Sequence, residues 1–144
     1  MIAAVDVHYD EAARRGRAAA VVFDAWEDGE AAGEYVAEVE NVADYVPGEF
    51  YRRELPCLMA VMGKVEPKPD VVVVGVAKTF FVGAPAREVL RGGSKMPLYV
   101  SAAGMEVEDA ADSVARMHGG YRIPTMLKRV DRVARGGGTS SVRP

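Results

Sequence analysis

The chain has 144 residues, of which 27% are charged, and a formal net charge of −3. This length fits one domain with a single core, which we expect over residues 1–135, followed by a flexible tail at 136–144. No run approaches the roughly 18 apolar residues that a membrane span needs, and the sequence opens with no signal pattern. We therefore expect a soluble cytoplasmic protein with no membrane partner. The single cysteine, Cys57, excludes an internal disulfide and a multi-cysteine zinc site, and its apolar neighbours predict a buried thiol.

The charges are unevenly distributed along the chain. Asp24 to Glu54 holds ten acids and two arginines, whereas Arg122 to Pro144 holds six basic residues and one acid. Such asymmetry fits a basic segment that faces phosphates and an acidic segment that attracts a metal ion or is merely solvated. We expect Glu34, Glu38 and Glu40 to be solvated on the outer face of a hairpin.

Alternating apolar and polar residues predict strands at 2–9 and 34–41, and a buried apolar run predicts a strand between them at 17–24, so we expect three consecutive antiparallel strands. The first strand carries Asp6 and His8 on one face and apolar side chains on the other. Asp6 and His8 are therefore predicted to be neighbours in space.

A helix is predicted over residues 49–62. Its core stripe is expected to consist of Leu55, Leu58, Met59 and Met62. Pro56 is expected to kink this helix or to force a restart after Leu55. The apolar run at 71–74 is typical of a central strand that is buried on both faces.

Glycines and prolines at 80–96 predict a loop, with one strand at 87–90. A short strand at 97–101 and two amphipathic helices, at 107–117 and from Pro124 to about residue 135, follow. The whole pattern predicts an α/β fold in which helices flank a sheet.

Three motifs occur in a fixed order: Asp6 on the first strand, the turn Tyr45-Val46-Pro47-Gly48 leading to Arg53-Glu54, and Gly75-Val76-Ala77-Lys78. In this order they resemble the endonuclease V family of metal-dependent nucleases for deaminated purines. The resemblance extends from Val5 to Arg135 and implies a ribonuclease H-like mixed sheet. It also implies a role in DNA repair, with DNA or RNA containing deoxyinosine or inosine as the partner.

Hydrolysis of a phosphodiester with Mg²⁺ or Mn²⁺ needs hard oxygen ligands, usually carboxylates. By resemblance, Asp6 and Glu54 are the metal ligands and catalytic acids, and Lys78 stabilises charge at the reacting phosphate. From the residues alone, Asp6 could instead pair with Lys78, Arg52 or Arg53. Glu54 could likewise be a solvated helix residue beside the two arginines.

The resemblance also implies a set of substrate contacts. The turn at 45–48 corresponds to a wedge that props open the strand beside a flipped base, whose unstacking is offset by aromatic stacking. Basic residues on the last helix could reach phosphates of any sequence. The residues expected to contact the substrate are Tyr45, Val46, Pro47, Gly48, Gly104, Tyr121, Arg122, Lys128 and Arg129.

The sequence departs from the family where a third metal ligand would stand. In the family a central strand ends in Asp-Gly, and a long crossover leads to the strand that ends in Gly-Val-Ala-Lys. Here Val74 runs directly into Gly75, and a parallel crossover needs at least about a dozen residues, so the two strands are predicted to be fused. Asp70 would lie some 13 Å from the Val74 end. Loss of one ligand predicts weak activity, because a 1 Å misplacement can cost about 100-fold.

Two alternatives stand beside a nuclease. The first is a nucleic-acid-binding homologue that has lost the chemistry, in which the turn at 45–48 and the basic last helix still bind. The second is a structural module whose open sheet edge pairs with another copy to form a homo-oligomer.

Overall fold

The computed structural model describes residues 1–44, 46–47, 49–75 and 85–136. The predictions for Tyr45, Gly48, Lys78 and the tail at 137–144 therefore lie outside the described residues. In chain order the elements are β1 (Ile2–Asp10), β2 (Arg15–Phe23), β3 (Gly33–Val39), α1 (Phe50–Met62), β4 (Val71–Val74), β5 (Arg87–Val89), β6 (Leu98–Val100), α2 (Val107–Arg116) and α3 (Thr125–Ala134).

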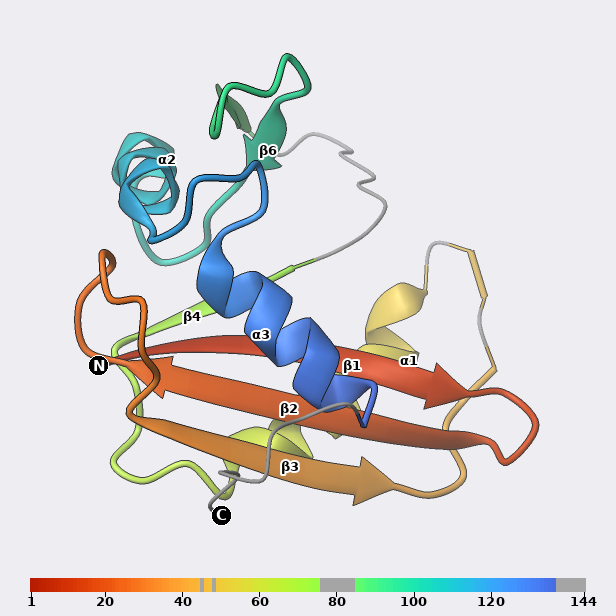
Figure 1. The fold of residues 1–144 in the computed structure, drawn as a ribbon. Coiled ribbons are helices and arrows are strands. Elements are labelled where there is room, and N and C mark those ends of the chain that lie inside the picture. Colours follow the sequence, from red (N-terminus) through yellow and green to blue (C-terminus); the bar gives the residue numbers. More distant parts are fainter. Residues whose placement is uncertain (45, 48, 76–84, 137–144) are drawn as a thin grey trace.

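A four-stranded mixed sheet in the order β3-β2-β1-β4 forms the centre of the molecule (Figure 1). The β1–β2 and β2–β3 pairs are antiparallel, which confirms the three predicted strands, whereas β4 runs parallel to β1. The four residues of β4 lie alongside Ile2 to Val5. From Asp6 onward, β1 has no strand on that side within the described part of the chain.

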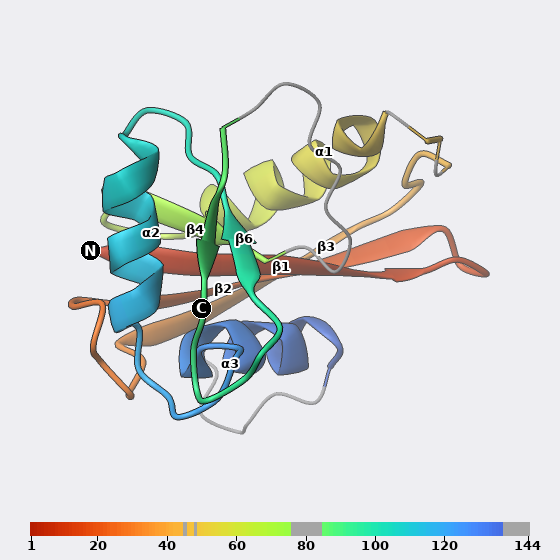
Figure 2. The same cartoon turned by 90° about the horizontal axis from the view of Figure 1, so that it is seen from above.

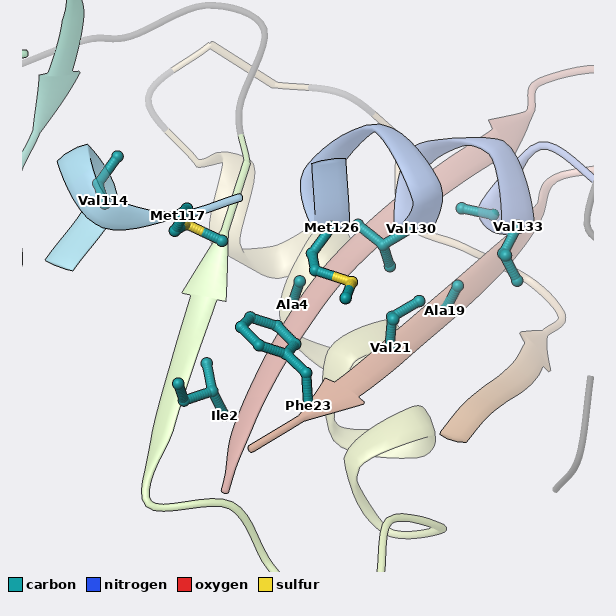
Figure 3. Packing of buried hydrophobic residues seen from close by; sticks show 11 residues of the cluster. Ile2, Ala4, Ala19, Val21, Phe23, Val114, Met117, Met126, Val130 and Val133 are labelled. Atoms are coloured by element: carbon teal, nitrogen blue, oxygen red, sulfur yellow. The ribbon is translucent and has the colours of Figure 1, made fainter. Parts of the chain in front are cut away.

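Helices cover the two faces of this sheet, with α3 on one side and α1 on the other (Figure 2). Figure 3 shows Met126, Val130 and Val133 of α3 packed against small and apolar side chains of β1 and β2. Each fully buried valine or methionine contributes roughly 1.5–3 kcal/mol. On the other face, Cys57 and Val61 of α1 are fully buried, which agrees with the predicted buried thiol.

The predicted core stripe of α1 is wrong in part. Leu55 and Met59 are 53% and 66% exposed, and the fully buried residues are Cys57 and Val61. Because apolar residues occur nearly all round this helix, spacing alone does not fix its orientation. The sheet beneath it is rich in alanine, so the smaller side chains make the closest contact. The helix also continues through Pro56, and the predicted restart does not occur.

Glu34 is a second correction, because it is buried rather than solvated. Its side chain is 2% exposed and forms an ion pair with Arg129 of α3. The alternation of β3 was interpreted correctly, but the face that carries Glu34 is the face that α3 covers. Glu38 and Glu40, farther along β3 and beyond it, are exposed as expected.

The prediction that β4 is buried on both faces is also wrong. Val72 and Val74 are 43% and 42% exposed. They belong to the α1 face of the sheet, through their pairing with Ala3 and Val5. In the described residues β4 is an edge strand, and α1 lies over the other strands of the sheet.

The strands predicted near 87–90 and 97–101 exist as β5 and β6, but they form a separate two-stranded sheet against α2 (Figure 1). Arginine side chains attach this unit to the connection between α2 and α3. Arg91 donates to the carbonyl of Met117 (2.6 Å), and Arg122 donates to the carbonyls of Met96 and Pro97 (3.0 Å each). Across the described ranges, every helix falls short of the length and apolar character that crossing a bilayer requires.

Candidate metal and nucleic-acid site

Asp6 lies where β1 loses its neighbour. Val5 pairs with Val74, the last residue of β4, and Asp6 is the next residue along β1. Its carboxylate accepts the backbone N–H of Val7 at 2.8 Å and lies close enough to the side chain of Asp131 on α3 for that carboxyl group to raise its pKa. Within the described residues, the half-buried acid thus has no neighbouring strand on one side, and it lies on the face that α3 covers.

Glu54 approaches the same edge from the opposite side of the sheet. It lies near the start of α1, and it is close enough to Asp6 for the negative charge of that residue to raise its pKa. Carboxylates from two elements, one on each face, are therefore near enough to interact beyond the last residue pair of β1 and β4. An uninterrupted sheet would separate them.

Both acids hold their protons unusually tightly. Burial is the main cause of a rise in the pKa of Asp6 to about 6, and the neighbouring Asp131 adds to it. Burial likewise raises the pKa of Glu54 to about 7, and the charge of Asp6 contributes. Such shifts mean that burial, together with neighbouring carboxyl groups, disfavours the charged form of both acids. Perturbed acids of this kind mark a candidate functional site.

Asp131 is the acid that sequence reasoning missed. Arg135, one turn later on α3, donates from Nε to both carboxylate oxygens of Asp131 at 3.1 Å. The available signal was positional: Asp131 is the single acid in the basic C-terminal segment, and it follows Leu127 by one helical turn on the side of α3 next to the core.

Arg53 is excluded as the ion-pair partner of Asp6, because it is bound elsewhere. It is 6% exposed, donates to Glu11 at 2.7 Å, and its guanidinium lies 3.8 Å from the ring centroid of Tyr9. These contacts tie the first turns of α1 to the end of β1. They therefore help to fix Glu54, the next residue, relative to Asp6.

The donor chemistry of these acids fits a hard divalent cation. Carboxylate oxygens are preferred by Mg²⁺, and two half-buried acids with raised pKa values lie near each other here, with Arg135 lowering the pKa of Asp6 only in part. Among the residues that the structure describes, no group of three His, Cys, Asp or Glu side chains is already arranged to hold a metal. Asp6 and Glu54 would hold the cation, with Asp131 beside Asp6.

The first half of the chain decides its family. The sequence profile of endonuclease V matches residues 1–76, the part that carries Asp6 and Glu54. The chain belongs to the endonuclease V family.

A curated endonuclease V from Rhodospirillum centenum (strain ATCC 51521 / SW) is 31% identical over 138 residues, an alignment that covers 62% of this chain. The chain spans 58% of the length of that relative.

Two crystal structures of endonuclease V share the fold. The Bacillus subtilis structure has a TM-score of 0.70 at 15% identity, covering 94% of this chain and 78% of that one. The Streptomyces avermitilis structure has a TM-score of 0.66 at 19% identity, covering 94% and 79%. The predicted ribonuclease H-like fold is thereby confirmed.

Two of the arginines expected to contact the substrate of this endonuclease V homologue make internal contacts. Arg122 donates to loop carbonyls before β6, and Arg129 pairs with the buried Glu34. Both side chains thus hold elements of the protein together. Their role as phosphate contacts stays a prediction.

Other residues expected to contact substrate lie at the surface. Tyr121 is 68% exposed, and the Nζ of Lys128 lies 4.0 Å from its ring centroid. Gly104 lies in an exposed turn before α2 with a φ of 80°, and Val46 and Pro47 are exposed before α1. These positions are compatible with substrate contact.

Proposed function

We propose that this chain is a divalent-metal-dependent nuclease that hydrolyses phosphodiester bonds in DNA or RNA at the free edge of β1. One observation carries the proposal: Asp6 and Glu54, far apart in sequence, converge there with raised pKa values. Membership of the endonuclease V family supports it. A cation needs the ionised carboxylates, so proton loss from this pair favours the binding-competent state.

A bound Mg²⁺ or Mn²⁺ would supply Lewis-acid stabilisation and a more acidic water. The chain's own residues hold the ligands in place. The N–H of Val7 fixes the carboxylate of Asp6, and the Arg53 contacts anchor the turn of α1 that carries Glu54. Arg135 neutralises part of the charge of Asp131.

We further propose, from the family resemblance, that the substrate contains deoxyinosine or inosine. In this proposal the turn at 45–48 acts as the wedge and Lys78 stabilises charge at the phosphate. The exposed pair of Tyr121 and Lys128 would add an aromatic surface beside a cation, which suits single-stranded nucleic acid. A role in DNA repair and a cytoplasmic location stay predictions.

Cleavage assays test the nuclease. End-labelled single strands of DNA and RNA, with and without one inosine, are incubated with Mg²⁺, Mn²⁺ or EDTA. We expect metal-dependent cleavage that falls by about 100-fold or more in Asp6→Asn and Glu54→Gln, because misplaced ligands misplace the attacking water. Asp70→Asn is the matched control, since Asp70 pairs with the N-terminus at the opposite end of β4. Absence of cleavage by the wild type, or equal losses in the control, would refute the proposal.

A nucleic-acid binder without catalysis is the second candidate. The lack of a ready-made trio of metal-binding side chains in the described residues favours it. It predicts binding that weakens steeply with salt and does not change when Mg²⁺ is added. Cleavage under any metal condition would exclude it.

The open edge of β4 supports self-association as a further possibility. Val72 and Val74 are exposed, and a second copy of β4 could pair with this edge about a two-fold axis. A charge introduced by Val72→Lys should then convert dimers to monomers in light scattering, while Leu90→Lys, at another exposed apolar site, should not. A wild type that is monomeric at all concentrations would dismiss this dimer.

A further inference from the structure

A hollow lies next to the acidic site, near the carboxyl-terminal ends of β1 and α3. It has a volume of about 160 Å³. Its polar lining consists of His8, Asp10, Arg15, Arg17, Glu38 and Arg135.

The strand register places this hollow at the next residue of β1 that faces the same side as Asp6. His8 is the next β1 residue on the same face, about 7 Å further at roughly 3.3 Å per residue. On β2, Arg17 lies directly opposite His8, and on β3, Glu38 lies opposite Arg17. A strand of nucleic acid that places one phosphate at Asp6 could therefore place a neighbouring phosphate over His8 and Arg17.

Each of the three arginines in the hollow is held by a hydrogen bond that its own Nε atom donates. The Nε of Arg17 donates to the carbonyl of Val133 at 3.3 Å, and the Nε of Arg15 donates to Glu40 at 3.0 Å. The Nε of Arg135 donates to Asp131. Within the described residues, their terminal amino groups make no hydrogen bond and His8 has no partner. Fixed guanidinium groups with free donors are suited to binding phosphate oxygens.

The balance of charge selects the kind of phosphate. Arg15 and Arg135 are already paired with Glu40 and Asp131, and the lining adds Asp10 and Glu38, so the hollow has no formal excess of positive charge when His8 is neutral. A phosphodiester carries one negative charge, whereas a terminal phosphate carries nearly two near neutral pH. These carboxylates therefore disfavour a strand end more than an internal phosphodiester, which relies on the free terminal amino groups of the arginines.

We propose that this hollow is a subsite for the phosphodiester that neighbours the one at Asp6. Arg17 and Arg135 supply its main donors, with His8 completing it. The proposal rests on the proposed function, because it requires a nucleic-acid strand along β1. It assigns part of substrate affinity to the β1–β2 hairpin and the end of α3.

Binding without metal tests the subsite separately from catalysis. Fluorescence anisotropy with a labelled single strand in EDTA is measured over a range of salt for the wild type, Arg135→Gln and His8→Ala. Arg135→Gln should weaken binding about fivefold or more and lower the salt slope by about 1, as expected for one lost phosphate contact. Arg132→Gln removes the same charge from an exposed position on α3 outside the hollow and should change affinity less than about twofold. Thermal unfolding confirms that each variant folds.

A series of oligonucleotides with one uncharged methylphosphonate linkage locates the contact. The wild type should lose affinity at one linkage, and Arg135→Gln should be insensitive to that same substitution. If Arg135→Gln and His8→Ala bind like Arg132→Gln, or if the wild type binds no strand, the subsite is refuted. Retained binding with the Arg135→Gln effect but no cleavage in Mg²⁺ or Mn²⁺ would refute only the nuclease. Cleavage with an unchanged KM in Arg135→Gln would refute only the subsite.

Discussion

Asp6 on β1 and Asp131 on α3 lie close enough for the neighbouring carboxyl group to add to the rise in the pKa of Asp6, although one belongs to the sheet and the other to the last helix. Two carboxylates repel each other unless one of them keeps its proton. In the absence of a cation, a proton on Asp6 therefore removes a repulsion between β1 and α3.

This proton predicts how stability depends on pH. The pKa of Asp6 is raised from 3.8 to about 6 and that of Glu54 from 4.5 to about 7, so the folded state binds protons more tightly than the unfolded chain. Their contribution is fully present below about pH 4 and is lost as the pH rises through about 7. We expect the melting temperature to fall between pH 5 and 8, with Asp6 accounting for about 1–2 kcal/mol after allowance for partial exposure.

Calorimetry of the Asp6→Asn variant tests the predicted fall in stability with rising pH. The variant should be more stable than the wild type at pH 8 and similar to it at pH 5. Asp70→Asn should leave the slope between pH 5 and 8 unchanged, since the pKa of Asp70 is lowered by the N-terminal amine. A wild type that becomes more stable from pH 5 to 8 would contradict the raised pKa values.

A divalent cation should replace the proton. Mg²⁺ or Mn²⁺ that binds only the folded state at 100 times its Kd would stabilise that state by about 2.7 kcal/mol. We expect a rise in melting temperature at pH 8 that is lost in Asp6→Asn and in Glu54→Gln, and that EDTA reverses. An equal rise in both variants would show that the cation binds elsewhere.

The buried ion pair of Glu34 and Arg129 predicts a strong stability effect at a position that the sequence associates with nucleic acid. Arg129→Leu leaves a buried carboxylate unpaired and should cost about 3–5 kcal/mol. The double variant with Glu34→Leu should recover most of this loss in urea unfolding. Full stability of Arg129→Leu, with weakened nucleic-acid binding, would instead support the phosphate role.

The contact between β2 and α1 predicts a steric effect at Gly16. A Cβ there would lie 2.6 Å from the Sγ of Cys57, so Gly16→Ala should destabilise the protein by about 1–3 kcal/mol. Adding Cys57→Ala should relieve the clash in part. Gly120→Ala, where a Cβ meets nothing within 4 Å, is the control and should change stability by less than about 0.5 kcal/mol. Equal unfolding midpoints for Gly16→Ala and the control would contradict the close packing.

The sequence predicts the elements of this fold better than their surroundings. Period-two alternation identified β1 and β3, and a 3.6-residue period identified α2 and α3. A continuous apolar run identified β2, because both faces of that strand are buried. The same patterns could not show that α3 lies over Glu34, since that depends on where a helix distant in sequence packs. Leu55 and Met59 were misplaced for a related reason: α1 is apolar on several sides.

The acids of the candidate site differ in the same way in how far the sequence predicts them. Asp6 and Glu54 were found because their motifs occur in a family order, and an acid on an apolar strand needs a partner. Asp131 was missed because it belongs to no such motif and its importance depends on α3 crossing β1. The arginines of the hollow beside His8 are likewise ordinary surface residues until cross-strand register brings them together.

In the part of the chain that the structure describes, β1 has strands on both sides through Val5 and on one side only from Asp6 onward, because β4 ends at Val74. If β4 had two further residues paired with β1, their backbone would lie beside Asp6. The sheet would then separate Glu54 on one face from Asp131 on the other. Among the described residues, the length of β4, rather than any one acid, thus decides whether carboxylates on opposite sides of the sheet can lie near each other.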